Sequence, residues 1–103
     1  MKVVNKKTHR PTPQDVYIGR PSILGNPYTH LMNISLGLVR VDTRDQAVEY
    51  YEEWLRKCVN LQIKEILGAL REIKEDSNLV CWCAPQRCHG DVIMKVWTEL
   101  QTR

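Results

Sequence analysis

The sequence predicts a small α/β domain, and the order of its apolar segments and its length lead to that prediction. Two short runs rich in β-branched and aromatic residues come first, helical patterns fill the middle, and a third apolar run precedes a last helical pattern. Strands that alternate with helices in this way are typical of a mostly parallel sheet. The 103 residues provide for one hydrophobic core, so we expect residues 1–103 to form a single three-layer domain with helices around the sheet.

The two N-terminal strands are short and bounded by turn formers. They are "KVVN" at 2–5 and "DVYIG" at 15–19, and a polar segment with two prolines separates them. The segment "RPSILGNPYTH" at 20–30 follows, and its prolines and glycine disfavour regular structure. Segment 30–41, "HLMNISLGLVRV", is ambiguous among loop, short helix and strand.

The first predicted helix has a well-defined start. Thr43 and Gln46 fit a capping box, and Asp45 lies in the first turn, where a negative charge suits the helix dipole. Apolar residues then recur at helical spacing as far as Cys58. This pattern predicts a helix over residues 43–58.

A second helix follows, and Gly68 lies inside its pattern. A glycine in a helix costs about 1 kcal/mol relative to alanine, so we interpret Gly68 as the mark of a close helix contact. The apolar stripe of this helix consists of Ile63, Ile66, Leu67, Leu70 and Ile73.

The C-terminal quarter predicts a strand, a loop and a helix in succession. "LVCWC" at 79–83 suits a buried strand, and "DVIMKVWTEL" from Asp91 to about residue 101 has helical spacing. Asp91 is expected at the N-cap or in the first turn of that helix. The loop at 84–90 therefore connects a strand end to a helix start.

The positive charge of the chain is concentrated near its N-terminus. The formal net charge is +3, and the first 20 residues hold five basic residues against one acidic residue. Such a region favours an anionic ligand or nucleic acid, unless it is simply a solvated basic tail. The chain does not resemble a strongly basic DNA-binding domain, so nucleic acid is the less favoured partner.

The expected location is the cytoplasm. The N-terminus, "MKVVNKKTHR", lacks the apolar core of a signal peptide, and no apolar run approaches the roughly 20 residues of a membrane span. We therefore expect no membrane partner. In that compartment the four cysteines are expected to stay reduced, which favours metal binding, chemistry or packing over disulfides.

Two loops that follow strands contain the candidate ligand-binding residues. In open α/β sheets, ligands bind where the carboxyl ends of strands meet helix N-termini, and such N-termini attract phosphate. We therefore predict a pocket for a nucleotide or nucleotide-derived anion between loops 19–28 and 83–91, if their strands are parallel neighbours. The candidate ligand-binding residues are Gly19, Arg20, Ser22, Gly25, Asn26, Arg87 and Gly90.

The candidates have different expected roles. Arg20 and Arg87 would hold phosphate, together with the helix N-terminus at Gly90 and Asp91. The alternative for the first loop is a rigid, proline-braced turn with one exposed arginine. The residues expected to contact a sugar or base, or to assist chemistry, are Ser22, Asn26 and His89.

Zinc is the alternative for the second loop. Cys81, Cys83, Cys88 and His89 form the pattern C-x-C-x4-C-H, which contains good zinc ligand types. Its spacing differs from the usual C-x2-C knuckle, and cysteines two apart in a strand point to the same face. The nucleotide pocket needs no cofactor, whereas this alternative describes a zinc-stabilised adaptor that binds nucleic acid or protein.

Thiol catalysis is the third hypothesis for this loop. Cys88 or Cys83 would be the nucleophile, with His89 as the base and Asp91 as the group that orients it. Adjacent residues such as Cys88 and His89 rarely direct their side chains at each other, so His9 or His30 could instead supply the base. In the purely structural alternative, the cysteines are small buried hydrophobes. Binding without turnover and catalysis both remain open, and so does the oligomeric state.

Two segments resemble the signature segments of a known domain family. "YIGRPSILGNPY" and "CWCAPQRCHGDVI" match the GRPS…GNP and CWC…CHGD segments of an uncharacterised family of about a hundred residues in phages and bacteria. The resemblance extends from "VYIGRPS" to the final helix. It implies a small α/β fold similar to Rossmann-like nucleotide-binding domains, and it implies no particular activity.

Overall fold

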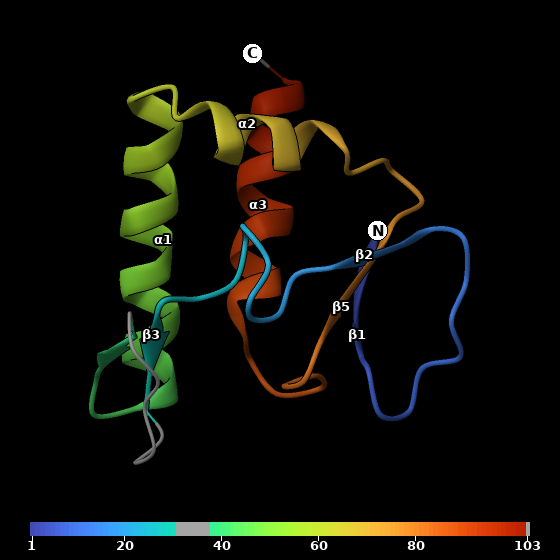
Figure 1. Ribbon diagram of the computed structural model, residues 1–103, viewed down its shortest axis with the longest axis horizontal. Coiled ribbons are helices and arrows are strands. Elements are labelled where there is room, and N and C mark those ends of the chain that lie inside the picture. The colour runs from blue at the N-terminus through green and yellow to red at the C-terminus, as the bar shows by residue number, and fades with distance from the viewer. Residues whose placement is uncertain (31–37, 103) are drawn as a thin grey trace.

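The computed structural model describes residues 1–30 and 38–102 (Figure 1). Most of the predicted elements are confirmed, with ends that shift by one or two residues. Of the ambiguous segment 30–41, residues 31–37 lie outside the described part and residues 39–40 form a strand. In chain order the elements are β1 (Lys2–Asn5), β2 (Asp15–Tyr17), β3 (Tyr28–Thr29), β4 (Val39–Arg40), α1 (Arg44–Asn60), α2 (Lys64–Arg71), β5 (Asn78–Cys81) and α3 (His89–Gln101).

The main sheet has three parallel strands, with β5 between β1 and β2. Val80 of β5 pairs with Val4 on one side and with Tyr17 on the other. A central parallel strand is buried on both faces, which explains the continuous apolar run that forms β5. β3 and β4 form a separate parallel pair. The prediction of a small α/β domain with a mostly parallel sheet is confirmed.

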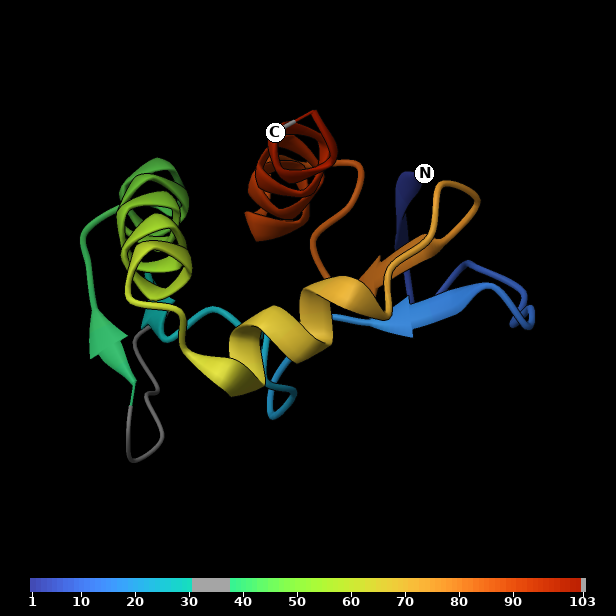
Figure 2. The ribbon, with the colours of Figure 1, turned by 90° about the horizontal axis from the view of Figure 1, so that it is seen from above.

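Helices α1 and α3 pack side by side and begin at the same end of the molecule (Figure 1). Figure 2 shows both helices nearly end-on, with the main sheet beside α3. α3 also packs against β1 and β5. Within the described ranges, no helix is long and apolar enough to cross a membrane. The largest fully buried side chains are Ile18, Tyr51, Leu55, Leu79, Cys81 and Ile93.

Helix caps explain where α1 and α3 begin. The Thr43 side chain accepts a hydrogen bond from the Gln46 backbone N–H at 3.1 Å, as the capping box predicted. Cys88 is the N-cap of α3, and its sulfur accepts from the Gly90 N–H at 3.3 Å. The Asp91 carboxylate accepts from the Cys88 N–H at 3.3 Å, which completes a second capping box. Asp91 therefore lies in the first turn, and α3 begins two residues earlier than predicted.

The surroundings of two glycines bear on their predicted roles. A Cβ atom added at Gly68 would meet nothing within 4 Å, so the interpretation of Gly68 as the mark of a close helix contact is wrong. A Cβ atom at Gly90 would lie 2.8 Å from Val3 and 3.0 Å from Ile18. Gly90 was predicted to bind a ligand, but its small size serves the packing of α3 against the sheet. β3 was not predicted, because its two residues lie in a segment interrupted by prolines.

Candidate functional site

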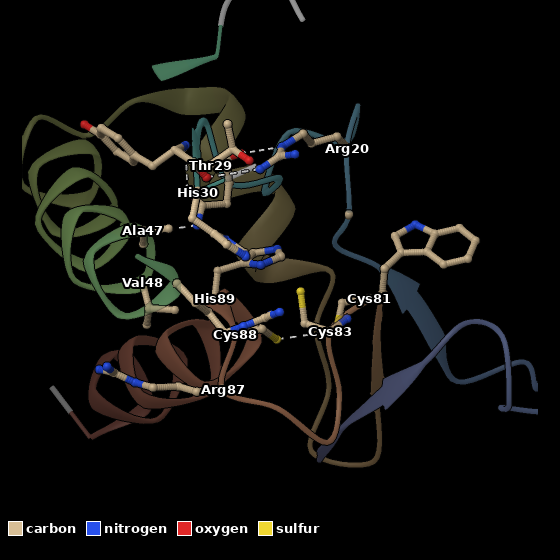
Figure 3. Close-up of a pocket in the computed structure, with 15 residues that line it drawn as sticks. Arg20, Thr29, His30, Ala47, Val48, Cys81, Cys83, Arg87, Cys88 and His89 are labelled. Carbon is tan, nitrogen blue, oxygen red and sulfur yellow. Dashed lines mark hydrogen bonds between the residues drawn. The ribbon is translucent and has the colours of Figure 1, made fainter. Parts of the chain in front are cut away.

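The loops after β2 and β5 meet at one edge of the sheet, because the two strands are parallel neighbours. They border a cavity of about 350 Å³, to which the first turn of α1 also contributes (Figure 3). Each loop contains a cis prolyl bond, at Arg20–Pro21 and at Ala84–Pro85. The cavity thus lies where the sequence predicts a pocket.

The side chain of Asn5, at the end of β1, positions the second loop. Its amide nitrogen donates to the carbonyls of Trp82 at 3.2 Å and Ala84 at 2.9 Å. These bonds hold the start of the loop against the sheet, so the residues that follow it face the cavity. Asn5 was not among the predicted site residues, because its partners are more than 75 residues away in sequence.

Most of the predicted site residues border the cavity, and five do not. Of the described chain, the segments that contribute are the first loop with β3 and His30, the start of α1, and the stretch from the end of β5 to the start of α3. The predicted residues at the cavity are Gly19, Arg20, Asn26, His30, Cys81, Cys83, Arg87, Cys88 and His89. Those outside its described lining are His9, Ser22, Gly25, Gly90 and Asp91.

Arg20 and Asn26 hold the first loop in shape as well as bordering the cavity. Arg20 donates from Nε to the Asn26 carbonyl at 2.7 Å and from Nη2 to the Tyr28 carbonyl at 3.0 Å. The buried Asn26 amide donates to the Ala47 carbonyl at 3.1 Å and accepts from the Tyr28 N–H at 2.8 Å. Both side chains therefore preorganise the cavity wall before any ligand binds.

Tight packing accounts for the glycines of the first loop. A Cβ atom at Gly19 would lie 2.6 Å from Cζ of Tyr17, whose hydroxyl donates to the Arg20 carbonyl at 2.8 Å. A Cβ atom at Gly25 would lie 3.0 Å from the Ser22 carbonyl oxygen. The Ser22 hydroxyl is buried in the loop, without a hydrogen-bond partner among the described residues. These residues determine the course of the loop, and only Gly19 of the three borders the cavity.

Arg44, the first residue of α1, borders the cavity and was not predicted. A cation in the first turn of a helix opposes the helix dipole. That unfavourable position is the feature of the sequence that could have identified Arg44. With Arg20 and Arg87, it makes three arginines in the lining of one cavity, to which the first turns of α1 and α3 also contribute.

His89 is buried and neutral. Its Nε2 lies 2.6 Å from the Ile18 carbonyl oxygen, and its ring packs edge-on against Tyr51 with centroids 5.0 Å apart. Because a carbonyl only accepts, Nε2 carries the proton and Nδ1 is left as an acceptor. Burial lowers the pKa of His89 and outweighs the opposing effect of the hydrogen bond to Ile18, which favours the neutral ring.

The three cysteines near the cavity form one cluster, and the pKa values of two of its members shift in opposite directions. The sulfurs of Cys81 and Cys88 lie 3.3 Å apart, and the Cys83 N–H donates to the Cys81 sulfur at 3.4 Å. Hydrogen bonds from the thiols of Cys81 and Cys88, and then the charge of Arg44, lower the pKa of Cys83 despite the opposing effect of burial. Hydrogen bonding with Cys81 and Cys83, together with burial, raises the pKa of Cys88.

The predicted catalytic residues His89, Asp91 and Cys88 have separate partners. Cys88 caps α3, the Asp91 carboxylate binds the Cys88 backbone, and Nε2 of His89 binds Ile18. Asp91 is exposed and does not contact the imidazole through any of these bonds. Of the two cysteines considered as nucleophiles, Cys83 is the half-buried one with the lowered pKa.

The zinc alternative finds little support in the geometry of its four residues. Nε2 of His89 already donates to a carbonyl, so this nitrogen is not directed at the cysteines. In the described part of the chain, no three His, Cys, Asp or Glu residues form a group that could hold a metal ion. Zinc binding stays a hypothesis for a direct metal assay.

Comparison with known proteins identifies one family. A family model described as "Domain of unknown function (DUF4326)" matches residues 1–99. Searches of curated proteins and of solved structures produced no match. The family match confirms the resemblance of the chain to an uncharacterised domain family.

Proposed function

The chain belongs to the DUF4326 family, and we propose that it binds a nucleotide or a nucleotide-derived anion in the cavity between its two loops. The observation that carries this proposal is that Arg20, Arg44 and Arg87 all belong to the lining of one cavity at the carboxyl edge of the sheet. Guanidinium groups bind phosphate and carboxylate through paired hydrogen bonds.

The helices add to the attraction for an anion. α1 and α3 begin at the same end of the molecule, and the first turn of each contributes residues to the cavity. Helix N-termini have a partial positive charge, so both dipoles favour a negative group there. The N-termini of two helices and the positive charges of three arginines therefore all favour an anion in the cavity.

Arg87 is able to turn towards a ligand. It donates to Asp45 at 3.0 Å, but the two side chains are 48% and 70% exposed. An exposed ion pair of this kind contributes about 1 kcal/mol or less, so the exchange of Asp45 for a bound phosphate costs little. Arg87 therefore serves as the adjustable cation of the site, while Arg20 is held by its backbone partners.

The rest of the cavity suits a sugar and a planar ring. Its aromatic and apolar lining includes Tyr28, Ala47, Val48 and Trp82. A volume of about 350 Å³ is at the lower end of the roughly 300–1,000 Å³ of small-molecule sites. A mononucleotide combines an aromatic base with a phosphate, which matches one apolar region and one cationic region.

Binding of nucleoside mono- and diphosphates by the double variant Arg44→Gln, Arg87→Gln tests the proposal. Each lost charge-assisted hydrogen bond is worth about 1.5–3 kcal/mol, so we expect each substitution to weaken binding by about 10- to 100-fold. Isothermal titration calorimetry at fixed salt measures the affinities. The matched control is Arg71→Gln, which removes an exposed arginine from α2, outside the cavity lining.

Two results would contradict the proposal. One is an unchanged affinity in the double variant, and the other is equal affinity for a nucleoside and its phosphate. Analysis of the ligand after incubation separates the two modes of action that the sequence leaves open. A ligand recovered intact indicates a binding module, and a converted ligand indicates an enzyme.

A further inference from the structure

We propose that Cys83 is a nucleophile of this cavity, which forms a covalent bond with anionic ligands that bear an electrophilic carbon. The inference rests on the proposed function, because the same cavity and cations would hold the ligand. It adds a chemical step and a substrate class to a site that otherwise only binds.

The position of Cys83 carries the inference. Cys83 comes two residues after β5, borders the cavity and is half-buried, so a bound ligand can reach its sulfur. Figure 3 shows it beside Cys81 and Cys88 at one end of the cavity. Cys81 and Cys88 are buried, and Cys88 also caps α3. Of the three, Cys83 alone combines access with freedom from a capping role.

The surroundings of Cys83 stabilise its thiolate. The thiols of Cys81 and Cys88 lie next to it in the cluster, Arg44 lines the same cavity, and together they lower the pKa of Cys83. A thiolate next to a cation is the reactive form of cysteine. Cys58 on α1 provides the contrast within the same chain, because it is also half-buried but burial raises its pKa.

The chemical step is a substitution that needs no oxidant or metal. A lone pair of the Cys83 thiolate forms a sulfur–carbon bond with the ligand. The bond between that carbon and its leaving group breaks at the same time, and the electron pair departs with the leaving group. Arg44 is a positioning residue in this step, because it holds the anionic part of the ligand and the thiolate near each other.

Alkylation of the full, reduced chain with iodoacetate and with iodoacetamide tests the proposal. Both reagents transfer a carbon to sulfur and release iodide, but only iodoacetate is an anion. A cationic cavity concentrates anions by about tenfold or more. We therefore expect the rate ratio of iodoacetate to iodoacetamide to be at least about tenfold higher at Cys83 than at Cys58, measured by peptide mass spectrometry.

Variants identify the source of that preference. Arg44→Gln is expected to lower the ratio at Cys83 towards the ratio at Cys58, whereas Arg71→Gln leaves it unchanged. Labelling of Cys83 is also expected to persist at pH 6, where that of Cys58 declines. The proposal is overturned if Cys58 reacts as fast as Cys83, or if both cysteines have the same ratio of rates.

The two proposals can fail separately. Selective labelling of Cys83 in a protein that binds no nucleotide would overturn the proposed function and support the nucleophile. Nucleotide binding with unselective labelling would overturn the nucleophile and leave the binding site. Cys83→Ser, checked for folding by circular dichroism, is expected to lose covalent labelling at the cavity, while labelling of Cys58 continues.

Discussion

His89 shows how the surroundings of a single residue decide its chemistry. The sequence places it beside a cysteine, a glycine and an aspartate, which suggests a catalytic or metal-binding role. In the fold, its ring instead packs against Tyr51 and its Nε2 donates to Ile18. The side chain links α3 to the residue after β2. In the neutral ring, Nδ1 is the nitrogen that can still accept a hydrogen bond.

The buried state of His89 predicts a dependence of stability on pH. Burial lowers its pKa in the folded protein, whereas the unfolded chain has the ordinary value of about 6.5. Below about pH 6.5 the unfolded state therefore binds a proton that the folded state does not. We expect the free energy of unfolding to fall between pH 7.5 and pH 5.5, by at most about 1.4 kcal/mol per pH unit from this group.

Urea denaturation at a series of pH values measures this effect. The comparison is His89→Gln, in which the amide can still donate to Ile18 but does not titrate. We expect a flatter stability profile in the variant over the same pH range. Parallel profiles in the two proteins would exclude His89 as the source of the pH dependence.

At the scale of elements, the start of α3 combines structural and functional roles. Cys88 and Asp91 form the capping box, while His89 packs in the core and Cys88 also borders the cavity. This arrangement accounts for the CHGD sequence without a catalytic role for its aspartate. Gly90 completes it, since a larger residue would meet Val3 and Ile18.

The cap predicts the effect of Asp91→Ala. Loss of the bond from the carboxylate to the Cys88 N–H is expected to destabilise the protein by about 1 kcal/mol, as is typical for helix caps. Thr43→Ala, which removes the cap of α1, is the matched control and is expected to have a similar effect. Thermal and urea unfolding measure both variants.

A catalytic Asp91 would produce the opposite pattern. In that case Asp91→Ala or Asp91→Asn would leave the unfolding midpoint unchanged and abolish conversion of the ligand. We expect the variants that fold to retain nucleotide affinity, because Asp91 is exposed and lies outside the described lining of the cavity.

At the scale of the whole molecule, the parallel arrangement of strands and helices creates the site. β5 lies between β1 and β2, and α1 and α3 begin at one end of the molecule. The cavity therefore receives one loop from each of two neighbouring strands and one turn from each of two helices. A continuous core, which includes Tyr51 and Ile93, holds these parts together.

The extent of that core predicts that folding does not require a metal. Core residues come from both long helices and from β5, and many are almost fully buried. Domains that depend on zinc for folding unfold when a chelator removes it. We expect EDTA to leave the circular dichroism spectrum and the Tm unchanged, and we expect far less than one zinc per chain in protein purified without a metal-affinity step.

The contrary result would revive the zinc alternative. About one zinc per chain, together with unfolding by the chelator, would identify Cys81, Cys83, Cys88 and His89 as the ligands to substitute first. It would also favour an adaptor that binds nucleic acid or protein over the nucleotide site.

The sequence by itself determined the three strands of the main sheet, the three helices and the edge of the sheet at which the cavity lies. The capping residues Thr43 and Gln46, the helical spacing before Cys58 and the apolar run of β5 act over a few neighbouring residues, so their effects can be predicted locally. The positions of Arg20 and Arg87 after two such strands were also readable. Parallel strands place their following loops on one edge whatever the details of packing.

Only the tertiary structure decided which side chains share the cavity and how the surroundings of its cysteines differ. Arg44 joins the cavity lining because α1 packs beside α3, and Asn5 supports the second loop because β1 pairs with β5. Cys83 and Cys88 differ because one borders the cavity near Arg44 while the other caps a helix. Gly68 has open space around it, although its pattern suggested a contact. These properties depend on packing between segments far apart in the chain, which local sequence patterns do not encode.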